Sequence, residues 1–200
     1  LLEWNNPGTI GNLTPGGKIL ASLFQSVTLR TAGFASFNQD ALTEASKVLS
    51  DLLMFVGGSS GATAGGVKTV TMGLVILSAV STMRGRRQVT VFGRSISQED
   101  ISNAVSVALL VMGLSLLGAA VITVCDGCSF MNAIYETISA LCTVGLTTGI
   151  TPTLCTASKL ILIVFMFFGR VGIMTIGVGF MMGDRAKERV QYAQTKVMLG

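Results

Sequence analysis

The sequence predicts an all-α membrane protein in which one structural unit occurs twice, and three observations lead to this fold class. First, 50% of the residues are hydrophobic, only 12% are charged, and the mean hydropathy is +0.68. A soluble surface needs about twice that share of charged residues. Second, the chain contains two long apolar runs. Third, a stretch of the first half recurs in the second half at a constant spacing.

The two apolar runs are long enough to cross a bilayer. Residues 101–124 carry no charge, and residues 160–182 carry Arg170 as their only charge. Each run exceeds the roughly 20 helical residues that span a hydrocarbon core of about 30 Å. Neither run lies at the N-terminus, so no signal peptide explains them. The chain opens on Leu1 without a Met, and we expect an N-terminal truncation.

The internal repeat keeps one spacing throughout and needs no gap. Residues 31–34, Thr-Ala-Gly-Phe, fall on residues 143–146, Thr-Val-Gly-Leu, and in the same register the Ala-Ser-Lys triplet at 45–47 falls on the identical triplet at 157–159. A shared register over non-apolar residues indicates duplication. We therefore expect an incomplete repeat at 1–83, a linker at 84–98, a complete repeat at 99–183 and a tail at 184–200.

The positions of the basic residues orient the predicted spans. The linker carries Arg84, Arg86, Arg87 and Arg94 without an acid between residues 83 and 97, and the tail is also net basic. By the positive-inside rule, linker and tail face the cytoplasm of a multi-pass protein in the cell membrane. The basic residues flank apolar spans without interleaved aromatics, which favours lipid headgroups over nucleic acid.

A short Gly-containing loop follows an amphipathic stretch in each repeat. Stretches 17–29 and 130–141 would extend only about 20 Å as helices, so we expect re-entrant helices that enter and leave the bilayer from one side. Non-helical backbone at membrane depth needs partners for its carbonyls, and a dehydrated cation can supply them. We expect a carbonyl selectivity filter for K⁺, the one metal ion predicted, at Thr31, Ala32, Gly33, Thr143, Val144 and Gly145.

A glycine-rich run interrupts the second span of the first repeat. Residues 41–83 would measure about 65 Å as one helix, so the helix must break, and the run 57–66 supplies five glycines for the break. The alternative is a kink that lets helices approach closely. The candidate gate residues in and beside this run are Gly57, Gly58, Ser59, Ser60, Gly61, Thr63, Gly65, Gly66 and Lys68.

Arg170 is the residue that is most costly to bury in lipid. A charge inside a membrane span costs several kcal/mol, so we expect Arg170 to face the protein interior. It is either a structural residue bonded to helix-end carbonyls or a charge that opposes the passage of a cation. Lys68 is the weaker candidate for the second role, since it could instead extend towards the cytoplasm.

Two further motifs lead to no function. The run Gly61 to Thr69 resembles a P-loop, but Val67 separates the second glycine pair from the lysine that must follow it directly. Cys125 and Cys128 have the spacing of half a zinc site, and the sequence holds no second half and no His. The carboxylates are scattered singly, so we expect no enzyme and no covalent cofactor.

The chain resembles the Ktr/Trk/HKT superfamily of potassium uptake proteins, and within it the C-terminal half of the bacterial KtrB type. The resemblance rests on residues 28–34 (TLRTAGF), 57–69 (GGSSGATAGGVKT), 91–94 (VFGR) and 139–146 (SALCTVGL). It implies four helix–pore loop–helix repeats around one pore, of which this chain holds two. It also implies that the glycine-rich loop obstructs the pore below the filter, with Arg170 close by.

The resemblance further implies partners. It predicts a homodimer and a cytoplasmic nucleotide-binding ring that regulates the pore, with sodium left open as a coupled ion. One glycine per filter loop gives a short row of carbonyls, so we expect modest selectivity. Two other readings stay open: a non-transporting membrane scaffold or sensor that inherited the repeats, and a secondary cation transporter.

Overall fold

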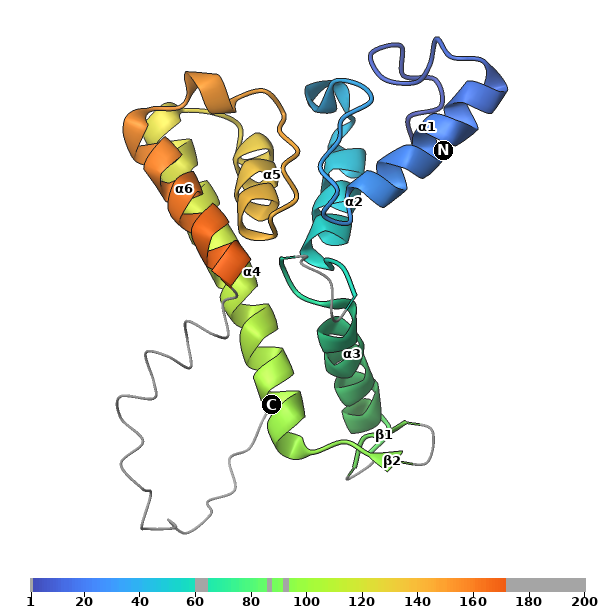
Figure 1. Ribbon diagram of the computed structural model, residues 1–200, viewed down its shortest axis with the longest axis vertical. Helices are drawn as coiled ribbons and strands as arrows, with labels where there is room; N and C mark the ends of the chain where they lie inside the picture. Colours follow the sequence, from blue (N-terminus) through green and yellow to red (C-terminus); the bar gives the residue numbers. More distant parts are fainter. Residues whose placement is uncertain (1, 60–64, 86–87, 92–93, 172–200) are drawn as a thin grey trace.

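The computed structural model describes residues 2–59, 65–85, 88–91 and 94–171, which contain six α-helices, two single-turn 3-10 helices and one small hairpin (Figure 1). The two-residue strands β1 (Thr90–Val91) and β2 (Arg94–Ser95) pair antiparallel within the basic linker, a detail that the sequence did not indicate. The fold is otherwise helical. The helices are α1 (Pro15–Thr28), α2 (Glu44–Phe55), α3 (Thr69–Met83), α4 (Gln98–Asp126), α5 (Phe130–Leu141) and α6 (Thr156–Val171).

The helix α4 is the long span of the second repeat. Its N-cap Ser97 accepts a hydrogen bond from the Asp100 amide at 3.1 Å, and Gly127 ends the helix with a φ of 65°. Its 29 residues are long and apolar enough to cross a membrane, while α3 is a shorter apolar helix. The second predicted span coincides with α6 as far as residue 171, and its remainder lies outside the described residues.

The spacing of the sequence repeat recurs in the structure. Two single-turn 3-10 helices, η1 (Gln39–Ala41) and η2 (Thr151–Thr153), begin at equivalent positions of the two copies, and so do α2 and α6. In the second copy, α5 packs against both α4 and α6, which also contact each other. In the first copy, α1 lies beside α2 at the same end of the molecule (Figure 1). No described helix packs against α1 in the way that α4 packs against α5.

The expected break in the second span of the first repeat separates α2 from α3. The helix α2 ends at Phe55 and α3 begins at Thr69. Residues on the two sides of the break are tied together, because the Gly57 amide donates to the Val67 carbonyl at 2.9 Å and the Val67 amide donates to the Phe55 carbonyl at 3.3 Å. Phe55 and Gly57 therefore lie beside Val67, so the end of α2 is close to the start of α3.

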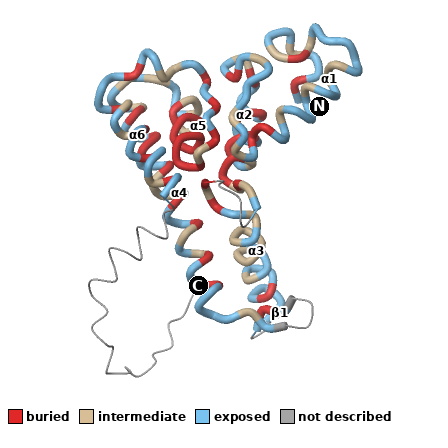
Figure 2. Tube along the Cα trace, in the orientation of Figure 1, coloured by how far each residue is buried: buried red, intermediate tan, exposed pale blue. Residues whose placement is uncertain are grey.

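The buried core surrounds α5. Eight of the twelve residues of this helix are buried, and Tyr135, Leu141 and Cys142 are fully enclosed. Figure 2 shows that burial concentrates on α5 and the chain that follows it, whereas α1 and the lower part of α4 show mostly exposed positions and α3 shows a mixture of intermediate and exposed positions. Between α4 and α6 the fit is tight, because a Cβ on Gly118 would collide with the Phe165 ring. Among the described residues, the short helix α5 and the loop that follows it are thus the most enclosed part of the structure.

Candidate functional site

Both predicted filter loops have the same unusual backbone. Thr31 and Thr143 are the only described non-glycine residues with positive φ, at 63° and 54°, and the glycines two positions later have φ values of 78° and 93°. A β-branched residue in this region is rare and strained. The same strained turn occurs twice, directly after a short helix.

A hydroxyl from the end of each short helix fixes the loop that follows it. The Thr28 hydroxyl donates to the Phe34 carbonyl at 2.7 Å, and the Ser139 hydroxyl donates to the Leu146 carbonyl at 2.5 Å. Phe34 and Leu146 are equivalent positions in the two copies. The Val144 amide also donates to the Ser139 carbonyl at 2.9 Å. These bonds hold the turn in a shape that the isolated chain would avoid.

The two loops meet each other. A Cβ placed on Gly33 would collide with the Val144 carbonyl oxygen, and one placed on Gly145 would lie 3.9 Å from the Gly33 Cα. Gly33 therefore has two reasons to be glycine, its positive φ and the lack of space, whereas Gly145 has only the first. The structure thus brings together predicted filter residues from opposite halves of the sequence.

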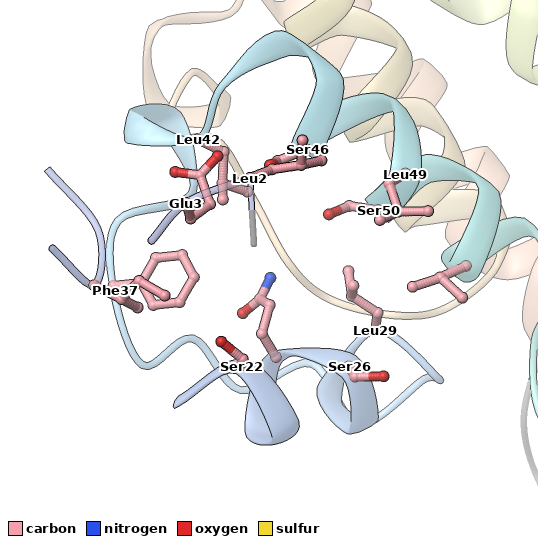
Figure 3. A pocket seen from close by; sticks show the side chains of 13 residues that line it. Leu2, Glu3, Ser22, Ser26, Leu29, Phe37, Leu42, Ser46, Leu49 and Ser50 are labelled. Carbon is pink, nitrogen blue, oxygen red and sulfur yellow. The ribbon is translucent and has the colours of Figure 1, made fainter. Parts of the chain in front are cut away.

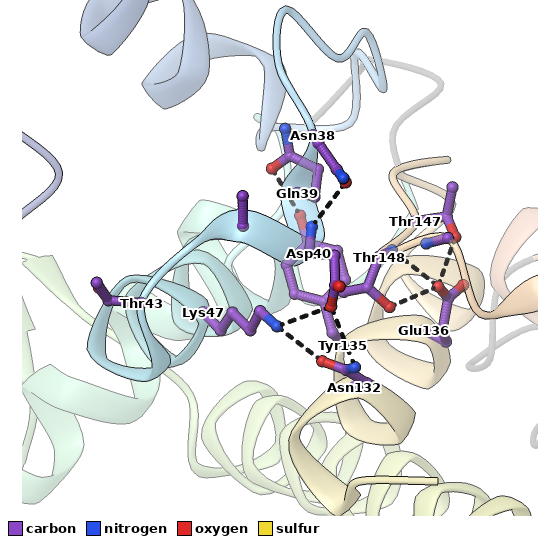
Figure 4. A network of polar contacts seen from close by, with 12 residues as sticks. Asn38, Gln39, Asp40, Thr43, Lys47, Asn132, Tyr135, Glu136, Thr147 and Thr148 are labelled. Carbon is purple, nitrogen blue, oxygen red and sulfur yellow. Dashed lines mark hydrogen bonds and ion pairs between the residues drawn. The ribbon is translucent and has the colours of Figure 1, made fainter. Parts of the chain in front are cut away.

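A buried glutamate, Glu136 on α5, organises the chain just after the second loop. Its Oε1 accepts hydrogen bonds from the Thr147 hydroxyl at 2.5 Å and the Thr148 amide at 2.9 Å, and its Oε2 accepts one from the Thr151 hydroxyl at 3.0 Å. Figure 4 shows Glu136 facing Thr147 and Thr148. The carboxylate is well compensated although it is buried. It anchors the outgoing side of the loop to the helix that leads into it.

A second polar cluster joins the two repeats. Lys47 on α2 is only 7% exposed and donates to Asn132 Oδ1 on α5 at 2.8 Å and to Asp40 Oδ1 at 3.3 Å. Beside it, the Tyr135 hydroxyl donates to Gln39 Oε1 at 3.2 Å (Figure 4). Because these bonds connect α2 and η1 to α5, they fix the position of one filter loop relative to the other.

The sequence did not single out Glu136, Lys47 or Asn132 as site residues. Only one signal pointed to them, namely isolated polar residues within apolar stretches, which is too common to be specific. Asp51 on α2 was missed in the same way. It is 7% exposed, and its Oδ1 has no hydrogen-bond partner. A buried carboxylate oxygen without a hydrogen bond is costly to retain.

The described part of the glycine-rich run packs beneath the second filter loop. Gly65 is buried, and its amide donates to the Thr143 hydroxyl at 3.1 Å. Gly66, with a φ of 75°, lies against the Cys142 side chain, and Gly57 lies against the Gly65 carbonyl. Gly58 accepts a bond from the Thr69 amide at 3.3 Å, and Ser59 is exposed. The predicted gate residues Ser60, Gly61 and Thr63 lie outside the described residues.

Arg170 is exposed within the described part of this chain, and its position facing the interior of the complete pore stays a prediction. The buried stripe of α6 runs through Ser158, Leu162, Phe165 and Gly169. Arg170 follows Gly169 by about 100° around the helix, which turns it off that stripe. Gly169 itself lies against the Leu141 carbonyl and the Thr143 methyl group, so Arg170 is one residue from a contact with the second loop. Lys68 is exposed at the start of α3.

A cavity of about 360 Å³ opens between α1, α2 and the N-terminal segment. Figure 3 shows serines from both helices, with Leu29 and Leu49, facing this space. Glu3 lies at its edge and binds the start of α2, because Glu3 Oε1 accepts from the Thr43 amide at 2.9 Å and from its hydroxyl at 2.6 Å. No filter glycine lines the cavity. It is therefore separate from the candidate site.

The site offers backbone oxygens and uncharged hydroxyls. Among the described residues, no three His, Cys, Asp or Glu side chains gather as they would to hold a metal ion. The four cysteines at 125, 128, 142 and 155 are free thiols. An arrangement of paired loops rich in carbonyls and hydroxyls is suited to a weakly held monovalent cation.

Comparison with known proteins gives a consistent result. The family described as "TrkH: Cation transport protein" matches residues 3–188. Ktr system potassium uptake protein B of Bacillus subtilis is 38% identical over 200 residues, which are all of this chain and 44% of that protein. Potassium/sodium uptake protein NtpJ of Enterococcus hirae is 35% identical over 188 residues, 92% of this chain and 42% of that protein.

The fold also matches a solved structure. The crystal structure of the potassium transporter TrkH from Vibrio parahaemolyticus aligns with a TM-score of 0.72 and 22% identity, over 88% of this chain and 39% of that one. At this identity the match shows a shared fold. The chain spans less than half the length of the curated relatives it matches.

Proposed function

The chain belongs to the TrkH family of cation transport proteins, and from this premise we propose that it forms part of a gated pore for potassium uptake through the cell membrane. The observation that carries the proposal is the contact between two equivalent loops, each with a left-handed threonine and a glycine two positions later, at Gly33 and Val144. Two unrelated turns would have no reason to share this geometry and to meet.

The proposed filter consists of the backbone carbonyls of residues 31–33 and 143–145. Positive φ values at the threonine and the glycine alternate with ordinary ones, which lets successive carbonyls be aimed in one direction. The hydroxyl bonds at Thr28 and Ser139 hold each loop, and Glu136 fixes the chain that leaves the second loop. A rigid set of carbonyls replaces the hydration shell of the ion without reorganising for each passage.

The proposed gate is the glycine-rich segment below the filter. Among its described residues, Gly57, Gly65 and Gly66 are packed so closely that a Cβ would collide with or crowd a neighbour, and Gly65 and Gly66 contact the second filter loop. Glycines allow such a segment to change backbone conformation at small cost. Lys68 follows this segment at the start of α3, and Arg170 lies one residue after Gly169, which contacts the second loop. In this proposal each positive charge would raise the barrier for a cation.

The surface supports a location in a bilayer. Large apolar side chains are exposed along α4 at Leu109, Leu117 and Val124, which suits contact with lipid and would be unfavourable in water. We place the basic linker on the cytoplasmic side and include a second copy and a cytoplasmic nucleotide-binding regulatory ring as partners. Sodium remains a candidate coupled ion, in line with the name of the Enterococcus hirae relative.

Rubidium uptake tests the proposed function. The complete gene is expressed in cells that lack their own potassium transport, and uptake is compared between wild type and Gly145→Ser at matched membrane expression. The Ser Cβ disfavours the left-handed conformation that Gly145 adopts. We expect wild type to take up rubidium and the variant to lose uptake or preference over sodium. If the wild-type protein transports no ion, the alternative function as a non-transporting membrane scaffold or sensor is favoured over the pore.

A further inference from the structure

The side chain of Thr143 connects three parts of the structure. Its hydroxyl accepts a hydrogen bond from the Gly65 amide at 3.1 Å, and Gly65 belongs to the glycine-rich segment of the first copy. Its methyl group would lie 2.9 Å from a Cβ on Gly169, in α6 of the second copy. The backbone of Thr143 is part of the proposed filter. One side chain thus reaches from the filter to the proposed gate and to the last helix.

The glycines around Thr143 are packed closely against it and against Cys142. A Cβ on Gly65 would collide with the Thr143 hydroxyl and would lie 2.9 Å from the Cys142 carbonyl. Gly66 follows with its own close approach to the Cys142 side chain, where a Cβ would lie 3.0 Å from the sulfur. Because both residues are packed directly on the filter loop, the segment cannot move without breaking the bond to Thr143.

The first filter loop provides an internal comparison. Thr31 has the same left-handed backbone as Thr143, but its hydroxyl makes no hydrogen bond within the part of the chain that the structure describes. The strained conformation therefore does not itself require the side-chain bond. The Thr143 hydroxyl has a partner because the glycine-rich segment lies beneath it.

We propose that the Thr143 hydroxyl is a positioning group that holds residues 65–67 against the last filter loop and so couples the gate to the filter. The inference rests on the proposed function for the roles of the two segments. It adds a side-chain role to a residue to which the proposed function assigns only a carbonyl. Without the hydroxyl, the buried Gly65 amide loses its acceptor, which favours the undocked position of the segment.

Cys142 is a native reporter of this docking. It is fully buried, and Gly66 lies directly on its side chain. When residues 65–67 move away, the thiol loses this cover and becomes open to a small reagent. In a background with Cys125→Ser, Cys128→Ser and Cys155→Ser, and with any cysteine outside this chain also replaced by serine, Cys142 is the only thiol. Its reaction with N-ethylmaleimide can then be followed by mass in membranes that contain the complete protein.

Three substitutions test the proposal in this background. Thr143→Val keeps the size and branching of the side chain and removes the acceptor, and we expect Cys142 to react roughly tenfold faster, the shift given by one lost hydrogen bond and a stranded amide. Thr143→Ser keeps the hydroxyl and should react close to the wild-type rate. Thr31→Val removes the equivalent hydroxyl of the other loop and should leave labelling unchanged.

The labelling result separates this proposal from the proposed function, because it does not depend on ion movement. Equal labelling rates in wild type and Thr143→Val overturn the proposal, and so does equal acceleration by Thr31→Val, which would mean general loosening. If Thr143→Val folds poorly, Gly65→Ala displaces the segment from the other side and should accelerate labelling too. Faster labelling with unchanged rubidium uptake supports the docking role and contradicts the gate instead.

Discussion

Replacing Gly33 by alanine should damage the proposed filter more than the same change at Gly145. The backbone would require alanine to adopt a φ of 78°, and this left-handed conformation costs a residue with a Cβ roughly 1 to 2 kcal/mol. It would also collide with the Val144 carbonyl oxygen, and overpacking adds about 1 to 3 kcal/mol. The sum is roughly 2 to 5 kcal/mol, concentrated where the two filter loops touch.

The assay is rubidium uptake and its inhibition by sodium at matched expression in cells without potassium transport of their own. We expect Gly33→Ala to lower uptake at least about tenfold, since about 1.4 kcal/mol corresponds to a factor of ten, and to weaken the preference over sodium. Gly145→Ala should lose less, because only the backbone cost applies.

Gly149→Ala is the matched control. Gly149 has a φ of 91°, but a Cβ there meets nothing within 4 Å, and the residue lies beyond the filter. It should lower thermal stability while leaving ion preference as in wild type. If Gly33→Ala and Gly149→Ala give the same uptake and the same preference, then the contact between the loops does not shape the filter and the reasoning fails.

Three further predictions concern the scaffold, each checked by the thermal unfolding midpoint of the purified protein in detergent. Gly118→Ala should lower the midpoint because its Cβ has no space against α6, whereas Gly113→Ala, where nothing lies within 4 Å, should raise stability by up to about 1 kcal/mol; the reverse order would contradict the packing of α4 on α6. Asp51→Asn should leave the midpoint equal or higher, since it replaces a buried carboxylate whose Oδ1 has no hydrogen-bond partner, while Lys47→Met should lower it by stranding the polar groups it bonds. Burial raises the pKa of Glu3, but hydrogen bonds to its carboxylate outweigh this and lower the pKa to about 2, so the midpoint difference between wild type and Glu3→Gln should be full above pH 4.5 and shrink as the pH falls towards 2; a constant difference would contradict it.

Much of the helical pattern could be predicted, because the spacing of apolar residues and the length of apolar runs determine it. The helix α5 begins and ends at the residues predicted for the second amphipathic stretch, and the break between α2 and α3 falls in the glycine-rich run. The spacing that relates Thr31 to Thr143 reappears between the starts of η1 and η2. These features depend on local sequence, which a single chain records directly.

The contacts that hold the candidate site could not be predicted in this way. Lys47 and Asn132 lie in different repeats and bond only because α2 packs on α5. Arg170 is exposed in this chain because it lies about 100° around α6 from the buried Gly169. Which face of α6 is buried cannot be read from its charge and hydropathy. The bond between Gly65 and Thr143 joins two segments whose separate motifs gave no sign of contact.

The most direct test of the central claim is the location of a bound ion. Crystals of the complete protein soaked in rubidium would show anomalous density for the ion. A carbonyl filter predicts a peak bounded by the backbone oxygens of residues 31–33 and 143–145, which weakens in Gly33→Ala crystals. Ordered loops without a peak between them, or a peak held by side chains elsewhere, would contradict the claim that these two loops form the ion site.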